Sequence, residues 1–112
     1  IDNLSILPSG PKPPNPSELL GSSRMNQVMA EAKKLYDIVI FDMPPVVAVT
    51  DAQIMASKAD GTILVVRENV SRKEPLTKAK ELLNMVQARV LGVVYNGAEN
   101  NKDSGYYYYY GN

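Results

Sequence analysis

Three runs of mainly apolar residues carry no regular polar alternation, and they lie at residues 38–41, 62–66 and 90–95. Continuous apolar runs are typical of strands covered on both faces of a parallel sheet, whereas half-exposed strands alternate. The first run ends on Asp42, and Pro44 and Pro45 then stop the strand because neither can donate to a ladder. We therefore predict a buried central strand in the stretch 36–45, with Asp42 at its carboxyl end.

Helical spacing predicts two helices between these strands. One covers residues 51–58 with Thr50 or Asp51 as its cap, and the other covers residues 74–88 with apolar side chains on one side. The second helix begins anywhere from residue 72 to residue 75, because a capping box and a first-turn proline favour different starts. Strand, helix, strand, helix, strand is the order of parallel βαβ units with right-handed crossovers.

The amino-terminal part begins with a strand candidate at residues 4–7 and a proline-rich segment at residues 11–16. The prolines exclude helix and sheet there, so we predict an extended course over the surface. Two roles stay open for this segment, a plain connector and a partner-binding loop, since long loops without secondary structure are often functional.

Capping residues predict two consecutive helices after the proline-rich segment. Asn15 as a cap and Pro16 as the first helical residue start a short helix that Gly21 ends. Ser22 or Ser23 caps a second helix, whose apolar residues recur at helical spacing and are expected to face the core. These residues are Met25, Val28, Met29, Ala32 and Tyr36.

Residues 98–112 differ from the rest of the chain, because no large apolar residue anchors their first part. They contain five consecutive tyrosines, and no regular element places five adjacent rings on one side. We predict an ordered part at residues 1–97 and a flexible, exposed tail at residues 98–112 that presents phenols to solvent or to an enzyme. The alternative is a low-complexity end without a role.

Composition narrows the possible chemistry. The chain carries 12 basic and 12 acidic residues, so its formal charge of zero gives no bias toward a nucleic-acid partner. Cysteine and histidine are both absent, which excludes disulfides, thiolate metal sites and Ser-His or Cys-His catalysis within this chain. No apolar run reaches the roughly 20 residues of a membrane span. The start at Ile1 is neither an initiator methionine nor a signal peptide, so we expect a cut amino end.

Asp42 is the leading candidate for a functional side chain. Ligands of open α/β sheets bind at the carboxyl ends of the strands. In nucleotide-hydrolysing folds, a carboxylate at that edge holds magnesium or its water shell. The structural alternative is that Asp42 caps the turn or helix that follows.

A series of motifs follows along the chain, namely Pro13-Pro14-Asn15-Pro16-Ser17-Glu18-Leu19-Leu20, Tyr36 to Pro45, Val49-Thr50-Asp51-Ala52, Gly61 to Arg67, Leu91 to Asn96 and the tyrosine cluster. Together they resemble the carboxyl half of the cytoplasmic kinase domain of the bacterial tyrosine kinases (BY-kinases) of capsule and exopolysaccharide synthesis. The resemblance rests on the ordered combination, because strands that end in an acid and prolines also recur in partition and cell-division ATPases.

The resemblance implies an α/β fold of the P-loop NTPase class, MinD/ParA-related, with helices flanking a parallel sheet that here lacks the amino-terminal P-loop strand. It also implies a protein-tyrosine autokinase that uses ATP and Mg²⁺. Asp42 matches the Walker B acid, which fixes magnesium near the β- and γ-phosphates. Asn96 matches an adenine-contacting amide at a strand end, and a turn residue before Gly97 is an equal alternative.

The resemblance further implies that a neighbouring subunit phosphorylates the tail in trans, which requires a homo-oligomer. The acceptor sites would be Tyr106, Tyr107, Tyr108, Tyr109 and Tyr110. A transmembrane activator, or polysaccharide co-polymerase, is the implied partner. The implied location is the cytoplasm, at the inner face of the membrane through that partner.

Two parts of the family pattern are missing from the chain. The sequence has no Gly-x-x-x-x-Gly-Lys-Ser/Thr loop, whose lysine and backbone amides cradle phosphates. The family's second acid-bearing strand, which precedes this part, is missing as well. We expect an amino-terminal truncation and a segment that is inactive alone, with a degenerate pseudo-enzyme as the alternative.

Two other functions stay open at this point. A MinD/ParA-type positioning ATPase would share the strands, but it usually ends in an amphipathic membrane helix and has no reason for terminal tyrosines. A non-catalytic regulatory or binding module would show no phosphorylation even when the full-length chain meets ATP and magnesium.

Overall fold

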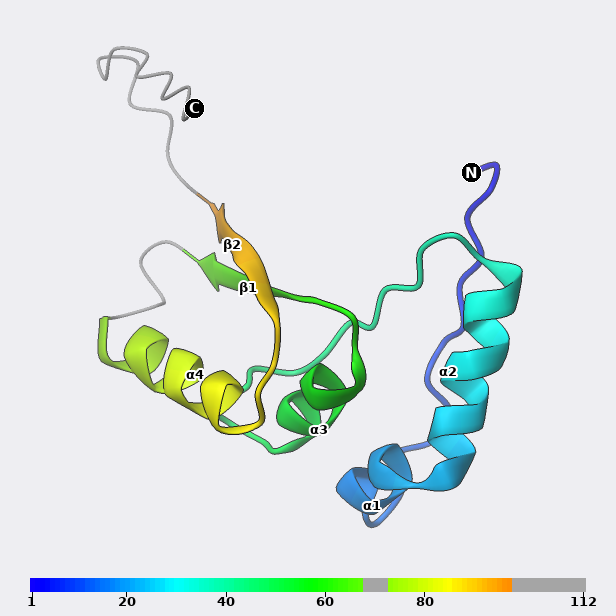
Figure 1. Ribbon diagram of the computed structural model, residues 1–112, viewed down its shortest axis with the longest axis horizontal. Helices are drawn as coiled ribbons and strands as arrows, with labels where there is room; N and C mark the ends of the chain where they lie inside the picture. Colours follow the sequence, from blue (N-terminus) through cyan, green and yellow to red (C-terminus); the bar gives the residue numbers. More distant parts are fainter. Residues whose placement is uncertain (68–72, 98–112) are drawn as a thin grey trace.

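The structure, a computed structural model, describes residues 1–67 and 73–97, whereas residues 68–72 and 98–112 lie outside the description. The predicted tyrosine tail therefore falls outside the described residues. In chain order the elements are α1 (Pro16–Gly21), α2 (Ser23–Leu35), α3 (Asp51–Lys58), β1 (Thr62–Arg67), α4 (Lys73–Met85) and β2 (Val90–Asn96) (Figure 1).

Strands β1 and β2 form a parallel two-stranded sheet, and α4 lies between them in the chain. At the beginning of the sheet, the Thr62 N–H donates to the Arg89 carbonyl at 2.8 Å. At its end, Arg67 stands opposite Asn96, so both strands finish at the same edge of the sheet. The predicted parallel βαβ unit is therefore confirmed for these two strands.

The core lies between the sheet and helices α3 and α4. Its buried cluster consists of Val46, Ala56, Ala79 and Leu83, and Leu64 of β1 packs against it. On the opposite face of β1, Ile63 and Val65 are 59% and 62% exposed. Strand β1 is thus covered on one face, whereas every residue of β2 is exposed, so the prediction of burial on both faces is wrong for the described residues. A sheet face is buried only where another layer lies against it, and α3 and α4 cover a single face.

The predicted central strand at residues 36–45 is absent from the structure, which corrects the sequence analysis. This segment leaves the end of α2 and runs to α3 without regular secondary structure (Figure 1). Ile38 and Ile40 are 78% and 85% exposed, although a central strand would bury both. A strand needs a neighbour that pairs with its N–H and C=O groups, and no described segment pairs with residues 36–45.

Two amino-terminal predictions are also wrong. Residues 4–7 form no strand, again because no described segment pairs with them. Helix α2 has no buried residue, and Val28 on its predicted core face is 41% exposed. Tyr36, expected on the same face, is instead the C-cap residue of α2. Met25, Met29 and Ala32 of the same face are half-buried, and α2 lies apart from the sheet (Figure 1).

The starts of α1 and α2 follow the capping residues as predicted. Helix α1 begins at Pro16 after the N-cap residue Asn15, whose side chain bonds to the Glu18 side chain instead of a backbone N–H. Helix α2 follows at once, and the hydroxyl of its N-cap residue Ser22 accepts from the Met25 N–H at 3.2 Å. Each capping residue acts within one turn of helix, which explains why the sequence alone is enough to predict where these two helices start.

Helix α3 agrees with the sequence prediction at both ends, whereas α4 ends earlier than predicted. Helix α3 has the predicted bounds, with Thr50 as its N-cap residue. Helix α4 is described from Lys73, directly after the undescribed residues 68–72, and it ends at Met85 instead of residue 88. Gln87 adopts a φ of 55°, and the Ala88 N–H donates to the Leu83 carbonyl at 3.0 Å. A left-handed residue just past the last turn is a common helix stop.

Expressed by itself, the 112-residue chain is expected to self-associate. Apolar side chains are exposed on the open face of the sheet and in the unpaired segment, as Val65 at 62% and Ile40 at 85% illustrate. Exposed apolar strands and unpaired edges favour intermolecular contacts. Sedimentation across a range of concentrations should show species larger than a monomer, and lysine at positions 40 and 65 should reduce them. A soluble monomer with a cooperative melt would contradict this prediction.

Candidate functional site

The Asp42 side chain is exposed and lies in the unpaired segment that precedes α3. No hydrogen bond or ion pair joins its carboxylate to another residue of the described chain. The turn at residues 46–48 is closed by the backbone, through the Ala48 N–H and the Pro45 carbonyl at 2.9 Å. Since Thr50 is the N-cap residue of α3, Asp42 caps neither element, and its carboxylate is available to a cation or to water.

Asn96 lies where the sequence analysis placed it, at the carboxyl end of β2. It stands opposite Arg67 in the strand register, so the two polar residues lie at the same edge of the sheet. Gly97 follows with a φ of 77°, a conformation that glycine adopts without strain, and the chain turns there. No hydrogen-bond ladder joins the segment of Asp42 to this edge. No described hydrogen bond or strand pairing links Asp42 to Asn96.

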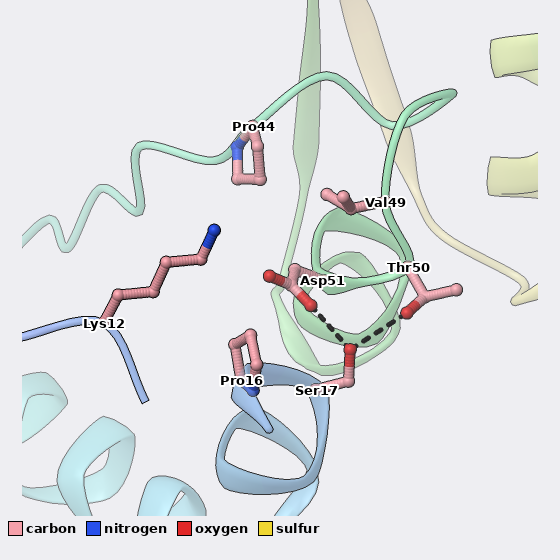
Figure 2. Close-up of a pocket in the computed structure, with 7 residues that line it drawn as sticks. All are labelled: Lys12, Pro16, Ser17, Pro44, Val49, Thr50 and Asp51. Atoms are coloured by element: carbon pink, nitrogen blue, oxygen red, sulfur yellow. Dashed lines mark hydrogen bonds between the residues drawn. The ribbon is translucent and has the colours of Figure 1, made fainter. Parts of the chain in front are cut away.

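A cavity of about 450 Å³ lies where the proline-rich segment and α1 meet the loop before α3 (Figure 2). Its volume is within the range of small-molecule sites, roughly 300–1,000 Å³. The Lys12 ammonium group and the Asp51 carboxylate are turned toward the same space, with Pro16 and Pro44 on either side of it (Figure 2). The lining residues are Lys12, Pro16, Ser17, Pro44, Val49, Thr50 and Asp51.

A hydrogen-bonded cluster closes one side of this cavity. The Ser17 hydroxyl donates to the Asp51 carboxylate at 2.6 Å, and its oxygen lies 3.0 Å from the Thr50 hydroxyl oxygen (Figure 2). Sequence reasoning missed this cluster. It gave Thr50 and Asp51 the role of helix start and placed them in one family motif and Ser17 in another, without connecting the two. Ser17 and Asp51 are 34 positions apart, and no spacing motif connects residues so distant in the chain.

A metal site made by this chain alone is not present in the described part. No group of three or more acidic side chains gathers there. Mg²⁺, however, commonly binds one or two carboxylates together with waters and substrate phosphates. The exposed Asp42 carboxylate fits that mode as one ligand, directly or through water. The groups that cradle phosphates would have to come from elsewhere, because the glycine-rich lysine loop is absent from the sequence.

The predicted acceptor residues Tyr106 to Tyr110 lie outside the described residues. In the part of the chain that the structure describes, no helix has both the length and the apolar character needed to cross a membrane.

Comparison with known proteins yields close relatives. No family model matches the chain. The chain is 48% identical to the tyrosine-protein kinase YwqD of Bacillus subtilis over 107 residues, which cover 96% of this chain and 45% of YwqD. It is 42% identical to CapB of Staphylococcus aureus over 111 residues, which cover 99% of this chain and 49% of CapB.

A solved structure has a similar fold over most of this chain. The kinase domain of Escherichia coli tyrosine kinase ETK matches with a TM-score of 0.75 and 34% identity, over 88% of this chain and 38% of that chain. The chain thus spans about half the length of the curated relatives YwqD and CapB and less than half of the solved kinase domain.

Proposed function

This chain belongs to the bacterial tyrosine kinases, and we propose that it forms part of an ATP-dependent protein-tyrosine autokinase of capsule or exopolysaccharide synthesis. The observation that carries the proposal is the 48% identity to YwqD over 96% of the chain. An exposed, unbonded Asp42 after an apolar run and a row of tyrosines in the sequence add chemical support.

The proposed fold is a P-loop NTPase-like α/β domain of the MinD/ParA-related type. Residues 1–97 would be the carboxyl part of the kinase domain, and residues 98–112 would be its substrate tail. The parallel β1-α4-β2 unit supports this assignment. The exposed apolar side chains of Ile38, Ile40 and Val65 support it further, because additional strands and helices of a larger domain would cover them.

In the proposed reaction, Asp42 holds Mg²⁺ or its water shell and Asn96 contacts the adenine. Mg²⁺, when bound, neutralises charge on the β- and γ-phosphates of ATP. The phenol oxygen of an acceptor tyrosine attacks the γ-phosphorus, the bond to the β–γ bridging oxygen breaks, and ADP leaves. The phenol proton passes to water or to a base. Because phosphoryl transfer depends mainly on positioning and charge neutralisation, a single well-placed acid contributes strongly.

The proposed assembly is a homo-oligomer in which one subunit phosphorylates the tail of its neighbour. A transmembrane activator, or polysaccharide co-polymerase, would hold the kinase at the inner face of the membrane. No nucleic-acid partner is proposed, since the formal charge of the chain is zero.

The test of the proposed function uses the full-length protein with ATP and Mg²⁺. We expect phosphotyrosine to accumulate and chelation of Mg²⁺ to prevent it. Transfer in trans is tested by mixing protein that carries Asp42→Ala with active protein whose tail tyrosines are phenylalanine. Phosphate on the Asp42→Ala chains supports trans transfer. ATP hydrolysis without phosphotyrosine would point to a positioning ATPase, and neither reaction would point to a binding module.

A further inference from the structure

Helix α3 is joined to the amino-terminal helices at both of its ends. At its first residue, the Ser17 hydroxyl of α1 donates to the Asp51 carboxylate at 2.6 Å. At its last residue, the Lys58 ammonium group donates to the Leu20 carbonyl at 2.8 Å and to the Asn26 side-chain oxygen at 2.7 Å. Lys58 thus contacts both α1 and α2 through bonds that do not involve Ser17. The bond between Ser17 and Asp51 can therefore act mainly on the loop that precedes α3.

The loop at residues 43–50, between Asp42 and α3, is held at few points. Two prolines with fixed φ angles follow soon after Asp42, and Val46 is buried in the core with 9% of its surface exposed. The Ala48 N–H then donates to the Pro45 carbonyl at 2.9 Å. At the far end of the loop, the tie to α1 is the hydrogen-bonded cluster around Ser17.

We propose that Ser17 and Asp51 are positioning residues whose hydrogen bond fixes the loop at residues 43–50 and thereby the place of the Asp42 carboxylate. Pro44, two positions after Asp42, lines the same cavity as Ser17 and Asp51. Because Pro44 and Pro45 restrict the backbone next to Asp42, a change in the packing around this cavity is passed on to Asp42. This inference rests on the proposed kinase function for the role of Asp42. It assigns no contact with substrate to Ser17 or Asp51.

The hydrogen bond between Ser17 and Asp51 is of a strong kind. A hydroxyl that donates to a carboxylate forms a charge-assisted bond, which is shorter and stronger than a neutral one. Both side chains belong to half-buried residues, so water competes less for them than at a fully exposed site. Asp51 also lies in the first turn of α3, where the helix dipole favours a negative charge.

Amide hydrogen exchange of the full-length protein tests directly whether the Ser17–Asp51 hydrogen bond fixes the loop. In a Ser17→Ala variant, we expect exchange of the Ala48 amide, inside the loop, to become roughly tenfold faster. Exchange of the Ile54 amide, which donates to the Thr50 carbonyl at 3.1 Å, should rise as well. The Ala59 amide lies at the other end of α3, where it donates to Met55, and it should exchange as in the wild type.

Two further variants separate positioning from general stability. Lys58→Met removes the contacts at the other end of α3, so it should speed exchange at Ala59 and leave Ala48 unchanged. Ser17→Thr keeps a hydroxyl and should restore slow exchange at Ala48. Thermal melting of each variant shows whether the protein is folded during the measurement.

Mg²⁺-dependent binding of a fluorescent ATP analogue gives the functional readout. Loss of a residue that orients a metal ligand commonly costs 10- to 100-fold in metal affinity. We therefore expect Ser17→Ala to raise the Mg²⁺ concentration required for half-maximal nucleotide binding by roughly 10-fold. Lys58→Met should leave this concentration unchanged.

The proposal is overturned if Ala48 exchanges normally in a folded Ser17→Ala protein, or if Lys58→Met loosens the loop to the same extent. Should Ser17→Ala fail to fold, Asp51→Asn keeps the shape with a weaker acceptor and supplies the same comparison. A wild-type protein that binds no nucleotide with Mg²⁺ would contradict the proposed function instead. In that case the exchange rates still decide whether the tie fixes the loop.

Discussion

Replacing Asp42 with alanine in the full-length protein is expected to reduce autophosphorylation by roughly 10²–10³-fold, the usual scale for losing one electrostatic contributor to the transition state. The fold should persist, because the Asp42 side chain is exposed and bonds to no described residue. Substitutions at such positions usually change the free energy of unfolding by no more than about 0.5 kcal/mol. Phosphotyrosine and thermal melting, measured on the same samples, test both statements.

A matched control for this variant lies in the same segment. Asp37 is also exposed and also belongs to the unpaired stretch after α2. Asp37→Ala removes the same charge from the protein, so a general effect of charge would appear in both variants. We expect Asp37→Ala to phosphorylate normally. Near-normal phosphorylation in a folded Asp42→Ala protein would remove Asp42 from the magnesium role.

Changing all five tyrosines at positions 106–110 to phenylalanine is expected to abolish most of the phosphate on the full-length chain. Phenylalanine keeps the rings and removes the acceptor oxygens, so binding through the rings is preserved. The effect should be near total if the cluster contains the main sites. Mass spectrometry of the variant after incubation with ATP and Mg²⁺ measures it.

The same variant tests whether negative charge from tail phosphorylation controls assembly of the oligomer. Each phosphate adds about −1.5 to −2 charges, so three phosphates place roughly five negative charges within a few residues. At moderate salt the Debye length is about 8–10 Å, so that repulsion would be felt across a nucleotide site that holds ATP. Phosphorylation should therefore release a docked tail and reduce the size of the oligomer. Sedimentation with and without ATP should show this change in the wild type and not in the variant.

The two remaining tyrosines provide the control. Tyr36 and Tyr95 are 46% and 57% exposed in the described chain, so both are alternative acceptors to be tested. The double variant Tyr36→Phe and Tyr95→Phe should keep most of its phosphate. If the phosphate persists on the five-site variant at Tyr36 or Tyr95, the cluster is not the main acceptor. An oligomer of equal size with and without phosphorylation would contradict the prediction that tail phosphorylation controls assembly.

The sequence by itself determined the helix starts and the β1-α4-β2 unit. Asn15 with Pro16, and Ser22, mark the starts of α1 and α2 through bonds and backbone angles within a single turn, so these starts depend on local sequence. The start of α3 at Thr50 was also predicted, although Thr50 makes no capping bond. The two paired strands were also predictable, because an apolar run on each side of a strong helix favours a parallel crossover. The end of α4 was missed, since the left-handed φ of Gln87 has no clear signal in its residue type.

Only the tertiary structure decided which apolar residues are covered and which distant residues meet. The run at residues 38–41 has the composition of a buried strand, yet Ile38 and Ile40 are exposed because no described strand lies beside them. Ser17 and Asp51, in turn, meet across 34 positions of the chain. The pattern of apolar residues along the sequence indicates which side chains can be buried. Strand pairing and hydrogen bonds between remote segments depend on what lies beside them in space, and local sequence does not contain that information.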